Sequence, residues 1–194
     1  MIETILKTQN PLLKTSRTRL LEILKEKSLL FGDFKLSSGV QSKYYIDGKK
    51  TTLDPEGLFL TAEIILDMIK DDRADAIGGL IIGADAIVSA VISLSFQRNC
   101  PLKGFFVRKE PKGHGTGNKI EGPLEEDSRV VIVDDVVTTG GSIVKAIEAV
   151  KESGCNVVRI ISIVDREQGA RQRFEQMGIT YSPLFTLTHL FEKR

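Results

Sequence analysis

Residues 130–142 read VVIVDDVVTTGGS, and this stretch decides the fold class. Its first four residues are β-branched, which is typical of a strand that is buried on both faces. Asp134 and Asp135 follow at the edge of the sheet where α/β proteins bind their ligands. The small residues of 138–142 lead into a helical pattern, so backbone N–H groups and a helix N-terminus become available to a phosphate. The stretch therefore predicts a ligand that carries both a phosphate and a ribose.

Strand and helix patterns alternate through the second half of the chain. The expected strands are Ala76–Leu80, Leu102–Val107, Val130–Val133, Val157–Val164 and Ser182–Leu187, and the expected helices are Ala86–Phe96, Gly141–Ser153 and Arg171–Gly178. Such alternation predicts an α/β fold, in which helices flank a central, mostly parallel sheet.

The N-terminal part has a different pattern. Arg17–Phe31 has the apolar spacing of a helix, Phe34–Asp47 resembles a hairpin, and Asp54–Pro55 marks the start of another helix. We expect this part, mainly residues 1–70, to form a small hood over the carboxyl edge of the sheet. The core would then span about residues 71–187.

Length and composition narrow the class further. A chain of 194 residues favours a single domain, residues 1–194, and 27 basic against 26 acidic side chains give no bulk attraction to nucleic acid or anionic membranes. Cys100 and Cys155 lack metal-ligand spacing, and the first residues lack a signal-peptide pattern, so we expect a cytoplasmic protein with reduced thiols. Ala76–Phe96 is apolar over about the length of a membrane helix, but Asp85 and three glycines favour a strand, a turn and a buried helix instead.

The segment Arg108–Leu124 interrupts the alternation with cations and glycines. Its cationic side chains are Arg108, Lys109, Lys112, His114 and Lys119. A long loop inside a compact domain is usually functional or disordered. It is either a solvated surface loop or, beside a phosphate site, a mobile lid that closes over a diphosphate.

The stretch 130–142 resembles the motif with which type I phosphoribosyltransferases bind 5-phosphoribosyl 1-diphosphate (PRPP). Three further segments resemble the orotate phosphoribosyltransferases of this class. RKEPKGHG at 108–115 is similar to their catalytic loop, FKLSSGVQSKYYID at 34–47 to their orotate-binding motif, and Asp165–Arg166 to the strand end where they place an arginine near orotate. Thr138 supports this resemblance, because purine-specific relatives tend to carry an aspartate there.

The resemblance implies a type I phosphoribosyltransferase fold and a Mg²⁺-dependent reaction. PRPP and orotate would give orotidine 5′-monophosphate and diphosphate, in de novo pyrimidine biosynthesis. The implied catalytic residues are Arg108, Lys109, Lys112, His114, Asp134 and Asp135. PRPP would be bound by these six residues together with Val136, Val137, Thr138, Thr139, Gly140, Gly141 and Ser142, and its diphosphate would also meet Gly79–Gly83. Orotate would be bound by Tyr45, Ile46, Thr138 and Arg166.

The resemblance also has implications for metal and partners. No direct protein site for the metal is implied, because Mg²⁺ would be held mainly through PRPP, with Asp134 and Asp135 as candidate contacts. A homodimer is implied, in which the loop 108–124 of one subunit reaches the site of its partner. The other partners would be the two small-molecule substrates, with no nucleic acid and no membrane.

Two other functions stay open, and the chain departs from the family pattern at two positions. The alternatives are a purine-specific or other type I phosphoribosyltransferase, and a PRPP-binding regulator of transcription. Against the regulator, Glu22 and Glu26 interrupt the basic face that a DNA-binding N-terminal helix would need. Ser37 and Ile82 stand where many bacterial members have lysines, so Mg²⁺ and the loop cations would have to supply the missing positive charge.

Overall fold

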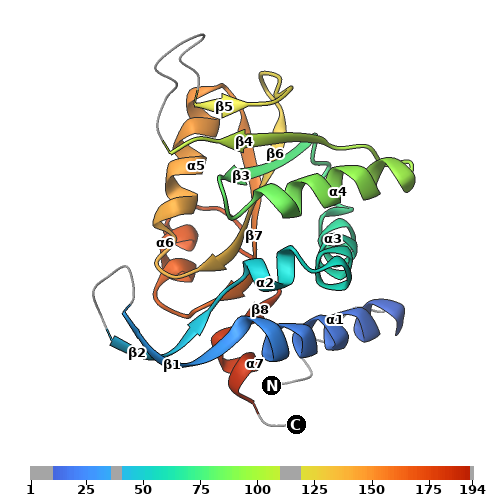
Figure 1. The fold of residues 1–194 in the computed structure, drawn as a ribbon. Coiled ribbons are helices and arrows are strands. Elements are labelled where there is room, and N and C mark those ends of the chain that lie inside the picture. The colour runs from blue at the N-terminus through green and yellow to red at the C-terminus, as the bar shows by residue number, and fades with distance from the viewer. Residues whose placement is uncertain (1–10, 36–40, 110–118, 193–194) are drawn as a thin grey trace.

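A six-stranded sheet forms the centre of the protein, seen in a computed structural model that describes residues 11–35, 41–109 and 119–192 (Figure 1). The strand order is β5-β4-β3-β6-β7-β8, and all neighbours are parallel except the pair β4 and β5. The strands are β3 (Ala76–Leu80), β4 (Lys103–Val107), β5 (Ile120–Glu121), β6 (Arg129–Val137), β7 (Asn156–Asp165) and β8 (Phe185–Thr186). The predicted α/β fold with a mostly parallel sheet is confirmed.

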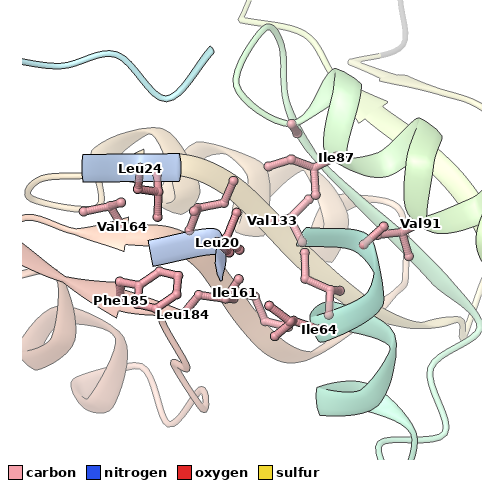
Figure 2. Packing of buried hydrophobic residues seen from close by; sticks show 14 of the residues in the cluster. Leu20, Leu24, Ile64, Ile87, Val91, Val133, Ile161, Val164, Leu184 and Phe185 are labelled. Carbon is pink, nitrogen blue, oxygen red and sulfur yellow. The ribbon is translucent and has the colours of Figure 1, made fainter. Parts of the chain in front are cut away.

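Helices cover both faces of this sheet (Figure 1). One face carries α1 (Pro11–Ile23), α3 (Pro55–Ile69) and α4 (Asp85–Gln97), and the other carries α5 (Gly141–Glu152) and α6 (Ala170–Gln176). The side chains of the β-branched run of β6 are buried on both faces of the sheet. Val131 and Val133 belong to the hydrophobic cluster under α1, α3 and α4, which we call the first cluster, and Val130 and Ile132 belong to the second cluster, under α5 and α6. Figure 2 shows the first cluster, in which Leu20 from α1 packs beside sheet residues.

The N-terminal helix ends earlier than the sequence pattern predicts. After α1 comes one π-helical turn, η2 (Leu24–Ser28), and the chain then enters strand β1 (Leu29–Lys35) instead of continuing as a helix to Phe31. Leu29 pairs with Ile46 of β2 (Gln41–Ile46), so the apolar residues at 29–31 satisfy a strand as well as a helix. The antiparallel pairing expected within 34–47 is confirmed, and its turn lies outside the described residues.

The next helices begin where turn chemistry places them. The short helix α2 (Lys49–Thr52) follows β2 directly, and α3 begins after Asp54. The predicted N-cap is confirmed, because Asp54 Oδ1 accepts a hydrogen bond from Gly57 N at 2.9 Å, with Pro55 in the first turn. The segment 76–96 forms β3, a turn and α4 as expected, and no helix among the described residues is long and apolar enough to cross a membrane.

The C-terminal strand is shorter than expected and is followed by a helix that the sequence pattern did not reveal. β8 has only two residues, and Leu187 begins the helix α7 (Leu187–Phe191). Thr186 and His189 form a capping box that ends β8 and starts α7. In it the backbone N–H of Thr186 donates a hydrogen bond to His189 Nδ1 at 2.9 Å.

Candidate active site

The carboxyl ends of β3 and β6 lie side by side at a topological switch point. The chain leaves β3 for β4 on one side of the sheet, and it leaves β6 for β7 on the other side. Ligands of open α/β sheets bind in the crevice at such a point. β6 pairs with β3 only as far as Ile132 but continues beside β7 to Val137, so Asp134 and Asp135 lie within the extended end of the strand and not after it.

Two glycines hold this acidic pair in place. A Cβ atom on Gly83, in the loop after β3, would lie 2.1 Å from Asp134 Oδ1 and 3.0 Å from Asp135 Oδ1. A Cβ atom on Gly48, in the turn after β2, would lie 2.7 Å from Asp135 Oδ2. The backbone therefore approaches both carboxylates more closely than any side chain allows. Asp135 lies between the loop that follows β3 and the start of α2.

Burial raises the pKa of both carboxyl groups of the pair. Desolvation, reinforced by the charge of Asp135, raises the pKa of Asp134 to about 7. Desolvation also raises the pKa of Asp135, although the ammonium of Lys49 opposes that shift from 3.8 Å away. Adjacent carboxylates repel one another when nothing neutralises them, so this site favours a bound cation or hydroxyl donors.

A small hollow of about 30 Å³ follows β6 at the start of α5. Its lining consists of Asp134, Val136, Val137, Thr138, Gly140, Gly141, Ser142 and Ile143. Gly140 is in the left-handed region with φ of 79°, and α5 has no side-chain N-cap in the described structure. The start of this helix, with its first N–H groups uncapped by a side chain, therefore lies at a small polar hollow, as in phosphate sites at helix N-termini.

A larger cavity of about 620 Å³ adjoins the acidic pair and extends toward β2 and α2. It is lined by Lys35, Tyr45, Ile46, Gly48, Lys49, Asp135, Val136, Thr138, Thr139, Arg166 and Gln168. All four residues predicted to bind the base line this cavity, although they are as far apart in the sequence as positions 45 and 166. The pairing of β6 with β7 explains why Thr138 and Arg166 lie together. Arg166 N donates a hydrogen bond to Val137 O at 2.8 Å, so Arg166 lies beside Thr138.

Arg166 gives this cavity a buried positive charge. The residue is only 6% exposed, and its Nε has no hydrogen-bond partner among the described residues. It also forms no ion pair with any residue that the structure describes. A buried guanidinium without a carboxylate partner is costly unless an anion binds to it. The cavity is therefore suited to a ligand with a negative charge.

Comparison with known proteins decides which family this arrangement belongs to. The family model of the phosphoribosyl transferase domain matches residues 62–177. The orotate phosphoribosyltransferase of Aquifex aeolicus (strain VF5) is 44% identical over 182 residues, which cover 92% of this chain and 100% of that relative. The chain belongs to the orotate phosphoribosyltransferase family. It has the type I phosphoribosyltransferase fold and is an enzyme of the phosphoribosyltransferase class.

Solved structures of the family agree. The orotate phosphoribosyltransferase of Mycobacterium tuberculosis H37Rv superimposes with a TM-score of 0.80 at 32% identity, covering 91% of this chain and 99% of that chain. The same protein in complex with PRPP superimposes with a TM-score of 0.77 at 31% identity, covering 90% and 98%. The enzyme of Aeropyrum pernix gives a TM-score of 0.71 at 31% identity, covering 88% and 96%.

Some predicted residues of this family member lie away from the two cavities or outside the described structure. Lys112 and His114 lie outside the described residues. Arg108 follows β4, and its Nε donates to Glu121 Oε1 at 2.8 Å. Neither Arg108 nor the exposed Lys109 lines the two cavities described above.

Sequence reasoning did not select four residues that line the larger cavity. These are Lys35, Gly48, Lys49 and Gln168. A signal for three of them existed, because Lys35 lies within the segment 34–47 that resembles an orotate-binding motif, and Gly48 and Lys49 come directly after it. Gln168 likewise comes two residues after Arg166, at the same strand end.

Proposed function

We propose that this protein transfers the 5-phosphoribosyl group of PRPP to orotate and produces orotidine 5′-monophosphate and diphosphate. The observation that carries the proposal is the buried guanidinium of Arg166, which has no ion pair among the described residues and lies in a polar cavity next to the acidic pair. Orotate carries a carboxylate, and a guanidinium binds a carboxylate with two parallel hydrogen bonds. Tyr45, Ile46 and Thr138 would line the remainder of the base site.

PRPP would bind across the two cavities. Its 5-phosphate would bind at the hollow between the end of β6 and the start of α5, where backbone N–H groups and the N-terminus of α5 are available. Asp134 and Asp135 would accept hydrogen bonds from the ribose hydroxyls. The diphosphate would meet the loop that follows β3 and, from the other side, the basic loop 108–124.

The chemistry of this transfer needs no covalent nucleophile. Breaking the bond between C1 of the ribose and the diphosphate oxygen builds positive charge on the sugar and negative charge on the leaving group. The protein therefore has to stabilise the diphosphate and exclude water from the cation-like sugar. We assign the first task to Arg108, Lys109, Lys112 and His114, with Lys112 nearest the leaving oxygen.

Mg²⁺ fits the same site through the substrate. The described residues contain no group of three or more His, Cys, Asp or Glu side chains that could hold a metal ion. Asp134 and Asp135 nevertheless provide hard oxygen donors, and burial raises the pKa of both carboxyl groups. A cation beside them would offset the cost of burying their charge, which supports the proposal. Bound with PRPP, Mg²⁺ would supply Lewis-acid stabilisation of phosphate oxygens.

We further propose a homodimer in which the loop 108–124 reaches the neighbouring site, with residues 1–194 as a single domain that acts in de novo pyrimidine biosynthesis. Arg108 and Lys109 support the first part, because they leave the sheet beside β5 and not at the larger cavity of their own subunit. A twofold partner can supply the site that such a loop serves.

The test is an assay with PRPP, Mg²⁺ and a panel of bases that contains orotate, uracil, adenine, guanine and hypoxanthine. We expect orotidine 5′-monophosphate with orotate and no nucleotide with the other four bases. A purine nucleotide as the product would replace the proposal with another type I phosphoribosyltransferase activity. Tight PRPP binding without transfer to any base would instead favour a regulator.

A further inference from the structure

We propose that Lys49 binds the diphosphate of PRPP, opposite the loop that follows β3. The inference rests on the proposed function, because it presumes that PRPP lies with its ribose on Asp134 and Asp135. No other residue of α2 lines the larger cavity. Lys49 would therefore be a substrate contact that the N-terminal elements contribute.

The backbone before Lys49 is fixed against the acidic pair. Gly48 packs so closely on Asp135 that a Cβ atom there would lie 2.7 Å from the carboxylate oxygen. The following turn is held by Thr52 N, which donates to Gly48 O at 2.9 Å, and by the buried hydroxyls of Ser28 and Thr51, which are 2.7 Å apart. Lys49 thus starts from a rigid position next to the ribose site.

The ammonium of Lys49 has capacity left for a ligand. Its Nζ lies 3.8 Å from Asp135 Oδ2, which is beyond hydrogen-bond distance, and its side chain is 50% exposed. The three N–H donors of a lysine are therefore not used up by this carboxylate. The other cations that line the larger cavity are Arg166, which we assign to orotate, and Lys35 at the end of β1.

The loop after β3 supplies no cation of its own to a diphosphate. Residues 81–84 are Ile-Ile-Gly-Ala, so the loop offers a diphosphate backbone N–H groups but no charged side chain. Asp135 has Gly83 on the side of Oδ1 and Gly48 on the side of Oδ2, so Lys49 lies at the junction between the ribose site and this loop. A diphosphate attached to C1 of that ribose is within the reach of about 6 Å that a lysine side chain has.

A second role for Lys49 has to be distinguished from this one. The ammonium could act only through Asp135, by compensating the charge of a buried carboxylate. That role would change the stability of the free protein and its affinity for any ligand with a ribose. Direct binding of the diphosphate would instead change the affinity only for ligands that carry the diphosphate.

The experiment compares Lys49→Ala, Lys49→Arg and the matched control Lys50→Ala. Lys50 is the next residue of α2, is exposed, and lines neither of the two cavities. For each variant we would measure the dissociation constants of PRPP, Mg²⁺-pyrophosphate and ribose 5-phosphate by calorimetry, together with the melting temperature. The transfer of phosphoribose to orotate by the wild-type protein is measured first.

We expect Lys49→Ala to weaken PRPP and pyrophosphate by about tenfold, at the low end of a hydrogen bond to a charged group. Ribose 5-phosphate should bind as in the wild type, Lys49→Arg should recover most of the affinity, and Lys50→Ala should change nothing. The inference is overturned if Lys49→Ala matches Lys50→Ala, or if it weakens ribose 5-phosphate as much as pyrophosphate. If the wild-type protein binds PRPP but does not convert orotate, only the proposed function is contradicted. The comparison of pyrophosphate affinities would still decide whether Lys49 binds the diphosphate.

Discussion

The guanidinium carbon of Arg166 lies 5.4 Å from the centroid of the Tyr44 ring. Tyr44 belongs to β2 and Arg166 follows β7, so this contact joins the N-terminal strand pair to the central sheet at the base cavity. Phe191 of α7 contacts the same tyrosine edge to face, with ring centroids 5.1 Å apart. Cation–π attraction and ring packing thus orient a guanidinium that has no ion pair in the described structure.

Replacing Tyr44 should therefore impair recognition of the base. Tyr44→Leu removes the ring and should raise the KM for orotate by the equivalent of about 0.5–2 kcal/mol, whereas Tyr44→Phe keeps the ring and should behave like the wild type. The dissociation constant of PRPP should not change in either variant. Steady-state kinetics with varied orotate measure the effect, and equal KM values for the two variants would show that the ring does not orient Arg166.

Arg166 itself should contribute to binding and not to stability. Its neighbours are engaged elsewhere, because Glu167 Oε2 accepts from Thr188 N at 2.9 Å and Asp165 Oδ1 accepts from Glu167 N at 2.8 Å. Arg166→Ala should weaken orotate by about 1.5–3 kcal/mol, the scale of a hydrogen bond to a charged group. Calorimetry with orotate and thermal unfolding check this together. A large drop in melting temperature with unchanged orotate affinity would make Arg166 a structural residue.

The two glycines of the phosphate hollow should respond differently to alanine. A Cβ atom on Gly140 would lie 2.5 Å from the ring of Phe174, and φ is 79°, so Gly140→Ala should destabilise the fold by more than about 1 kcal/mol. The nearest atoms to a Cβ on Gly141 are 3.9 Å away, so Gly141→Ala should fold normally. Gly141 lines the hollow, so the added methyl group should lower PRPP affinity. Normal PRPP binding by a folded Gly141→Ala protein would contradict the phosphate assignment.

Asp134 should make the stability of the free protein depend on pH. Its pKa of about 7 in the folded state is above the ordinary value of 3.8, so the folded protein holds a proton that the unfolded chain has released. The free energy of unfolding should therefore fall as pH rises from about 4 to about 7, and level off above this range. Asp134→Asn lacks this carboxyl group and therefore this pH dependence. Its free energy of unfolding, compared with that of the wild type, should rise between about pH 4 and about pH 7. Urea unfolding at several pH values measures the difference, which would be constant if Asp134 were not perturbed.

Mixing two inactive variants tests the shared site. Lys112→Ala should damage the loop 108–124, and Asp135→Asn should damage the ribose site. If the loop serves the neighbouring subunit, a mixed dimer has one site with both defects and one intact site, and random exchange should restore about a quarter of wild-type activity. If the loop serves its own subunit, every site keeps a defect. A mixture that stays inactive after subunit exchange has been demonstrated would exclude the shared-site arrangement.

Sequence patterns predicted the parts of the protein in which local chemistry and tertiary environment agree. The run 130–133 is β-branched and is buried on both faces, and Asp54 caps a helix in the sequence position where caps are expected. The apolar spacing predicts a helix at Leu29, but an apolar residue at that position fits a strand equally well, and its pairing with Ile46 shows that the strand forms. The patterns also did not reveal α7, whose capping box uses His189 in place of the usual Glu or Gln.

Site residues could likewise be predicted only where local sequence patterns determine their position. Thr138 and Arg166 follow neighbouring strands, so the order of the sheet predicts that they meet. Lys49 reaches the same cavity only because Gly48 packs against Asp135, and that approach between two distant segments leaves no periodic signal in the sequence.

The separate sheet formed by β1 and β2 has a consequence for how nucleobase preference can evolve in this architecture. Tyr45 and Ile46 line the base cavity from a ladder that shares no strand with the six-stranded sheet. Substitutions in that ladder can remodel the wall that meets the base, while β6 and the start of α5 keep the phosphate hollow unchanged. Grafting the segment 41–49 between relatives should therefore change the affinity for the base and leave the affinity for ribose 5-phosphate as a fixed property of the recipient.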